Sequence, residues 1–159
     1  MIKNVFYSLI LISLSAQTVF SQQGKVDSSF NVLDDGQIGD GFDGTVRTLL
    51  LQRDGTLLVG GDYLNLNGTP ASYLTRLNLD GSIDESFDTG TGFNGKIYAS
   101  CLQSDGKIIV GGNFTSYNGI SAGRIIRLNE DGSYDATFNT IIGATTGIVY
   151  DIALQPDGE

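Results

Sequence analysis

The sequence predicts an all-β fold, a β-propeller-type array of four-stranded antiparallel blades that is incomplete in this chain. Three observations lead to this prediction. Residues 46–87 and 97–138 align without a gap, so the chain repeats a unit of about 50 residues. Asp-Gly turns divide each unit into short apolar segments that suit β-strands. No segment keeps a 3.6-residue apolar period, so we expect no long helix.

The composition fits short strands joined by tight turns. The chain has 159 residues with 22 glycines but only 2 prolines, and its 40% hydrophobic content is enough for a globular core. Its net charge of −9 repels phosphate backbones, so we expect no nucleic-acid partner. The chain has no histidine, and it therefore lacks the commonest general base and metal ligand. We expect the single cysteine, Cys101, to be a small buried apolar residue rather than a reactive thiol.

Residues 1–21 are predicted to be a signal peptide. Lys3 supplies a positive start, residues 5–14 are mostly apolar, and residues 19–21 suit cleavage before Gln22. The apolar run is too short to cross a bilayer core about 30 Å thick, so we expect no membrane span after signal removal. An uncleaved anchor is the alternative. The prediction is a protein that is secreted, extracellular or held at the cell surface.

The rest of the chain divides along the repeat. We assign residues 22–45 to an N-terminal partial repeat and acidic loop, 46–87 to repeat 1, 88–96 to an inter-blade loop, 97–138 to repeat 2 and 139–159 to a truncated repeat 3. A propeller needs about four to eight blades, and only two complete units are present. We therefore expect an N-terminal fragment of a longer propeller, in which residues 26–30 pair with the last blade and close the ring.

Each complete unit is predicted to hold four strands. The first three cover 46–52, 57–63 and 73–78 in repeat 1, and 97–103, 108–114 and 124–129 in repeat 2. A short fourth strand ends at Phe87 or Phe138, and a loop with an Asn-Gly pair precedes the third strand. Glycine pairs at 60–61 and 111–112 interrupt the second strands, which predicts a bulge or a close backbone approach there.

Two motifs recur in both units. One is Leu-Gln-x-Asp-Gly-Lys, three apolar residues and Gly-Gly-x-Phe; the other is Arg-Leu-Asn-x-Asp-Gly-Ser-x-Asp, with phenylalanine three residues later. These motifs resemble the delta-60 repeat family of secreted bacterial proteins, with Thr56 in place of lysine and Tyr63 in place of phenylalanine. The resemblance implies a propeller-like extracellular repeat protein with no established activity.

Two glycine patterns match the dinucleotide-binding fingerprint, at Gly39, Gly41 and Gly44 and again at Gly90, Gly92 and Gly95. That site needs a helix after the glycines, because the helix N-terminus holds the pyrophosphate. Here a strand is predicted to follow. We interpret both patterns as inter-blade turns and expect no bound cofactor.

Acidic turns are the candidate metal ligands. Oxygen ligands of the kind that calcium prefers occur near one turn in each unit, at Asn78, Asp80 and Asp84 and at Asn129, Asp131 and Asp135. The EF-hand pattern is not met, so we expect these side chains to cap hairpin turns and predict no metal-site residues. A second, weaker candidate is the group Asp34, Asp35, Asp40 and Asp43.

No catalytic residues are predicted. A glycosidase needs two converging carboxylates, and the equivalent first-strand positions hold only Asp151, against Thr48 and Ala99. We therefore predict that the protein is not an enzyme. Six tyrosines could stack on sugars or anchor a partner, although we expect most to pack between blades: Tyr63, Tyr73, Tyr98, Tyr117, Tyr134 and Tyr150.

The sequence thus favours a structural or protein-interaction module, with an unidentified surface protein or glycan as partner. A carbohydrate-binding or hydrolysing propeller is the alternative.

Overall fold

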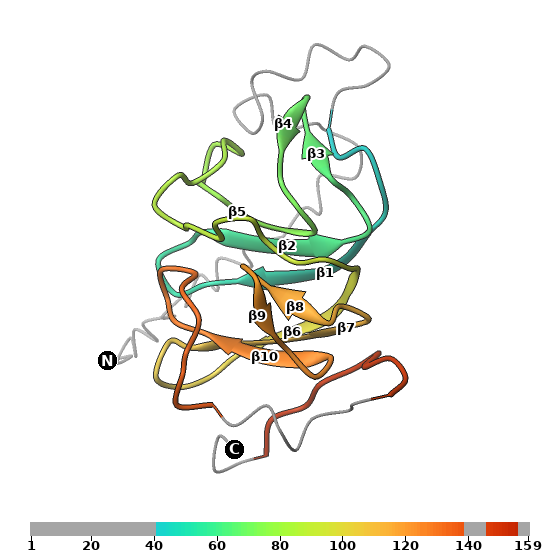
Figure 1. The fold of residues 1–159 in the computed structure, drawn as a ribbon. Helices are drawn as coiled ribbons and strands as arrows, with labels where there is room; N and C mark the ends of the chain where they lie inside the picture. Colours follow the sequence, from blue (N-terminus) through green and yellow to red (C-terminus); the bar gives the residue numbers. More distant parts are fainter. Residues whose placement is uncertain (1–40, 139–145, 156–159) are drawn as a thin grey trace, which may run out of the picture.

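The computed structural model describes residues 41–138 and 146–155 (Figure 1). Their secondary structure is all-β, as predicted, and they contain no helix long and apolar enough to cross a membrane. The predicted signal peptide, the partial repeat up to residue 40 with the ring-closing segment 26–30, and residues 139–145 and 156–159 of the truncated repeat lie outside the described residues.

Each complete unit forms a three-stranded antiparallel sheet. In the first unit the order is β1 (Val46–Leu51), β2 (Leu57–Gly61) and β5 (Leu74–Leu77). In the second it is β6 (Ile97–Leu102), β7 (Ile108–Gly112) and β10 (Ile125–Leu128). The predicted Asp-Gly hairpins join the first two strands of each sheet, and their glycines, Gly55 and Gly106, have φ of 89° and 87°. Such angles favour glycine, which explains the residue choice at both turns.

The predicted fourth strand is much shorter than expected. In each unit it is reduced to a single antiparallel β-bridge, which pairs Leu77 with Ile83 in the first unit and Leu128 with Tyr134 in the second. In the first unit the chain then turns, because the carboxylate of Asp84 accepts a hydrogen bond from the backbone N–H of Ser86 at 2.9 Å. The turn removes these residues from the ladder, so pairing ends after one bridge.

The predicted loop before the third strand is instead a small hairpin. It consists of β3 (Asn65–Leu66) with β4 (Thr69–Pro70), and of β8 (Ser116–Tyr117) with β9 (Ile120–Ser121) in the second unit. The Asn-Gly pairs form the turns, and φ is positive at both residues of each pair. The third strands also begin one residue later than predicted, because Tyr73 and Arg124 have φ of 71° and 68° and cannot continue a strand.

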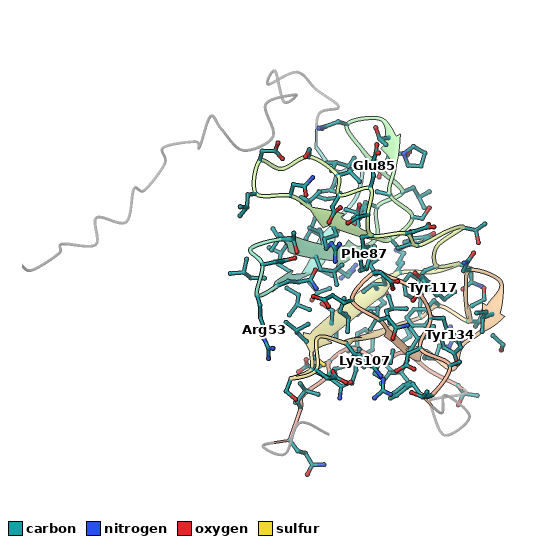
Figure 2. All side chains as sticks on the ribbon, turned by 90° about the vertical axis from the view of Figure 1, so that its left-hand side faces the viewer. Arg53, Glu85, Phe87, Lys107, Tyr117 and Tyr134 are labelled. Carbon is teal, nitrogen blue, oxygen red and sulfur yellow. The ribbon has the colours of Figure 1, made fainter. Side chains whose placement is uncertain are left out.

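The two sheets stack face to face, one above the other in Figure 1. The main core lies between them and combines Leu58, Leu74 and Phe87 of the first unit with residues of the second, among them Ile97 and Val110. Phe87 and Tyr117 are buried in this main core and Tyr134 packs against it; all three are labelled in Figure 2. A second core cluster covers the opposite face of the first sheet and contains the equivalents of the second unit's core residues. Each unit therefore uses its two faces in the same way.

The glycine pairs serve both predicted purposes. A Cβ at Gly60 would lie 2.8 Å from the Cγ2 atoms of Ile97 and Thr48, so this glycine permits the close approach of the second unit. At Gly111 the corresponding neighbour is Val149 of the third unit, at 2.6 Å. Register shifts opposite the glycine pairs, between Val46 and Thr48 and at the same place in β6, are the predicted bulges.

Candidate functional site

The repeated arginine of the third strand locks each unit together. Nε of Arg76 donates to Asp84 at 2.7 Å, its guanidinium lies 4.8 Å from the ring centre of Phe87, and Nη1 donates to the carbonyl of Glu130 in the next unit at 2.7 Å. Arg127 repeats the contact to its own carboxylate, Asp135, at 2.7 Å. Each arginine is paired with the aspartate of its own unit, so we interpret the motif as one that stabilises the fold.

The candidate calcium ligands in the turns are engaged as caps. Asp80 accepts hydrogen bonds from the backbone N–H of Ser82 at 3.0 Å and from its hydroxyl at 2.6 Å, and Asp131 holds Ser133 in the same way. The hydroxyl of Ser82 lowers the pKa of Asp80. These bonds are the expected turn caps. The described residues contain no group of three or more acidic, cysteine or histidine side chains suited to a metal ion.

The second acidic candidate is divided. Asp34, Asp35 and Asp40 lie outside the described residues. Asp43 accepts hydrogen bonds from the backbone N–H groups of Leu64 and Asn65, at 2.7 and 2.9 Å, and holds the start of the β3–β4 hairpin. The backbone N–H of Asn65 lowers the pKa of this carboxyl.

The glycine patterns lead into a strand, as the sequence predicted. Gly95 is followed by β6, and Gly92, with φ of 73°, packs against Ser72. Gly39 lies outside the described residues, and Gly41 has φ of 88°. Since no helix N-terminus follows Gly95, this pattern lacks the element that holds a pyrophosphate.

The tyrosines divide into two groups. Tyr63 and Tyr117 are buried, and their hydroxyls donate to the carbonyls of Val59 and Gly132, each at 2.5 Å. Burial raises the pKa of both phenols. Tyr73 and Tyr134 are half-buried and pack on the main core, whereas Tyr150 is 66% exposed. Packing between or within blades is thus confirmed for four of the six.

The remaining tyrosines form a stack that crosses three units. Residues 47, 98 and 150 occupy equivalent positions in the repeat. The guanidinium of Arg47 lies 4.7 Å from the ring centre of Tyr98, and the rings of Tyr98 and Tyr150 meet edge to face at 5.1 Å. Arg47 and Tyr98 stand where the registers of β1 and β6 shift, and such a bulge redirects a side chain. We call Arg47, Tyr98 and Tyr150 the stacked row.

A carboxylate fixes the start of the stacked row. Arg47 donates from Nε and Nη2 to the two oxygens of Asp62 at 2.6 and 2.7 Å, and Lys96 donates to Asp62 at 3.1 Å. The Arg47 guanidinium lowers the pKa of Asp62, so this carboxyl is charged at neutral pH. The bidentate pair holds the guanidinium in the orientation that it needs to cover Tyr98.

At the interface between the second and third units, the positions equivalent to Arg47, Asp62 and Lys96 hold uncharged residues. Asn113 is the equivalent of Asp62, Tyr98 replaces Arg47, and Ile148 replaces Lys96. Val149, the residue after Ile148, donates from its backbone N–H to the carbonyl of Gly112 at 3.1 Å and so joins the third unit to the second. The side-chain oxygen of Asn113 is buried and has no hydrogen-bond partner among the described residues.

Comparison with known proteins agrees with this architecture. The sequence model of a family described as a domain of unknown function (DUF5122) with a β-propeller fold matches residues 52–87 and 103–138. The chain is built of β-propeller repeats. No curated protein matches the sequence.

The structure also shows the contacts of Thr48 and Asp151, two of the first-strand positions compared in the sequence analysis. Thr48 bonds to Ser100 of the next repeat, 2.8 Å between their hydroxyls, and Asp151 accepts from the backbone N–H of Ile152 at 2.8 Å. Cys101 is half-buried rather than fully buried, and burial raises the pKa of its thiol. A raised pKa favours the protonated thiol, which is a poor nucleophile. The stacked row was not predicted; aligning positions 47, 98 and 150 shows that its members are equivalent, but not that they stack.

Proposed function

We propose that this chain is a structural and protein-interaction module of the delta-60 type that works outside the cell. The observation that supports it most is an apolar surface on the first propeller repeat. Leu49 and Leu51 of β1 are 61% and 69% exposed, and Leu79, beside the β1–β2 turn, is also exposed. We call these three side chains the free face.

The second repeat indicates what covers such a surface. The equivalents of Leu49 and Leu51 are Ser100 and Leu102, and both face the first repeat. The first repeat covers them with Thr48 and Leu50, and Arg76 reaches across to the carbonyl of Glu130, which is the equivalent of Leu79. The occupant that fits the free face is therefore another propeller repeat, packed through the side that the first repeat turns toward the second.

A second copy of this chain is the partner to which we commit. Burying a leucine side chain contributes roughly 1.5–3 kcal/mol, so covering two or three of them favours association. The contact joins unlike faces of two copies, and such contacts extend to larger assemblies if they do not close.

Sedimentation velocity over a range of protein concentrations tests this function. We expect the chain to associate as its concentration rises, and a Leu49→Ser/Leu51→Ser variant to remain monomeric. Ile120→Ser, which changes an exposed apolar residue on β9, should associate like the unchanged chain. A folded, monodisperse monomer at every concentration would contradict the proposal.

Export rests on the sequence of residues 1–21 and has its own test. We expect the protein, expressed with these residues in a bacterial host, to appear outside the cytoplasm and to lose its first 21 residues. Recovery in the cytoplasm at full length would contradict this part. Carbohydrate binding is a second candidate function, which the exposed stacked row favours.

A further inference from the structure

We propose that the stacked row binds a pyranose oligosaccharide, at a site distinct from the free face. The site consists of the exposed ring of Tyr150, the supporting ring of Tyr98 and the charged group of Arg47, Asp62 and Lys96 at its end. This inference does not depend on the proposed self-association.

The stacked row exposes aromatic surface that the fold does not use. The other described tyrosines lie buried or half-buried in the cores, with fixed hydroxyls where burial is complete. Among the described residues Tyr150 makes one ring contact, with Tyr98, and it is 66% exposed. A rigid ring that keeps an apolar face toward water suits a ligand with a flat apolar face.

The polar groups beside the rings suit hydroxyl groups. Arg47, Asp62 and Lys96 bring donors and charged acceptors to the end of the stacked row, and their mutual bonds hold them in place before a ligand arrives. A pyranose ring combines an apolar C–H face with hydroxyls around its edge, which is the pattern that a tyrosine ring bordered by such groups can satisfy.

Other ligand classes fit this surface less well. The chain carries a net charge of −9, which disfavours nucleic acid. A protein partner favours a broader apolar patch, and on this chain the strongly exposed leucines gather instead on the free face. The stacked row is narrow and mixes rings with charges, so a sugar chain laid along it is the better match.

The test uses the full chain and soluble oligomers of β-linked glucose, of N-acetylglucosamine and of galacturonic acid. Saturation-transfer NMR identifies a bound oligomer through its ring C–H protons, and titration calorimetry then gives its affinity. We expect at least one oligomer to bind, and Tyr150→Ala to weaken its affinity by about tenfold or more through the loss of stacking. Tyr150→Phe keeps the ring and should bind within about threefold of the unchanged chain.

Two further variants make the result specific. Ile120→Ala removes an exposed apolar side chain from β9 and should leave oligomer affinity unchanged. Arg47→Met removes the charge above Tyr98 and should weaken binding, while a thermal melt checks that the fold persists. Binding of none of the three oligomers at millimolar concentration would overturn the proposal. Equal affinity for the unchanged chain and Tyr150→Ala would also overturn it, as would retention of a protein partner in the absence of any sugar binding.

Discussion

At the scale of single residues, the repeated polar side chains stabilise turns and interfaces. Arg76 shows this best, because one buried guanidinium contacts a carboxylate, an aromatic ring and a carbonyl of the next repeat. The motif that defines the repeat in the sequence is therefore a structural lock. Arg127 repeats the carboxylate and ring contacts in the second repeat, with Asp135 and Phe138.

Replacing Arg76 with methionine should destabilise the fold by roughly 3 kcal/mol, because Asp84 loses its buried partner and the Glu130 carbonyl loses a donor. Urea unfolding of the two proteins measures the difference. Arg53→Met is the matched control, since Arg53 is exposed and makes a single bond to Ser104; it should change stability by less than about 0.5 kcal/mol. Similar losses for both variants would refute the lock.

Acid should destabilise the protein through Asp135. The hydroxyl of Thr137 and the cations of Lys107 and Arg127 hold the pKa of this carboxyl well below its usual value. A carboxyl with a lowered pKa in the folded state contributes stability above its unfolded pKa of about 3.9, and this stability is lost as pH falls below that value. Urea midpoints between pH 7 and pH 3 should therefore fall at the acid end. Asp135→Asn should be less stable at pH 7 and lose less on acidification; a parallel decline in both proteins would contradict this assignment.

At the scale of elements, the close approach of neighbouring strands explains the glycine pairs. Gly60 lies where β2 passes the first strand of the next repeat, and a methyl group there would overlap Ile97 and Thr48. β-Branched side chains have few rotamers in which to move away. The spacing between blades is thus set by a residue without a side chain.

Gly60→Ala should cost about 1–3 kcal/mol, as overpacking does in other cores. In an Ile97→Ala background the same change should cost less, because one of the two nearest methyl groups is gone. Chemical unfolding of the two single variants and the double variant gives the coupling free energy. If the losses in free energy of unfolding of the two single variants simply add in the double variant, contact with Ile97 is not the reason for glycine at position 60.

The strands and their hairpins could be predicted because they depend on local chemistry. Short apolar runs mark β1 and β7, and Asp-Gly sets the turns between paired strands. The β3–β4 hairpin was missed because strands of two residues are too short to show alternation. The stacked row was missed because it depends on a bulge at Arg47 and on the distance between repeats, neither of which follows from the spacing of apolar residues.

At the scale of the whole molecule, one packing step relates each unit to the next. The first repeat covers the second through Thr48, Leu50 and Arg76, and Val149 and Ile152 approach the second repeat at the same glycine position. If a further repeat packed on the first one as the first packs on the second, it would cover the free face. Our central claim is that this face receives another repeat.

Hydrogen exchange of the unchanged chain at low and high protein concentration tests this claim most directly. If a second copy covers the free face, peptides that contain β1 should exchange more slowly at high concentration, because their strand opens less often when packed. The β8–β9 hairpin of the second unit contains none of the three free-face residues and should exchange at the same rate in both samples. Exchange in β1 that does not depend on concentration would contradict the claim.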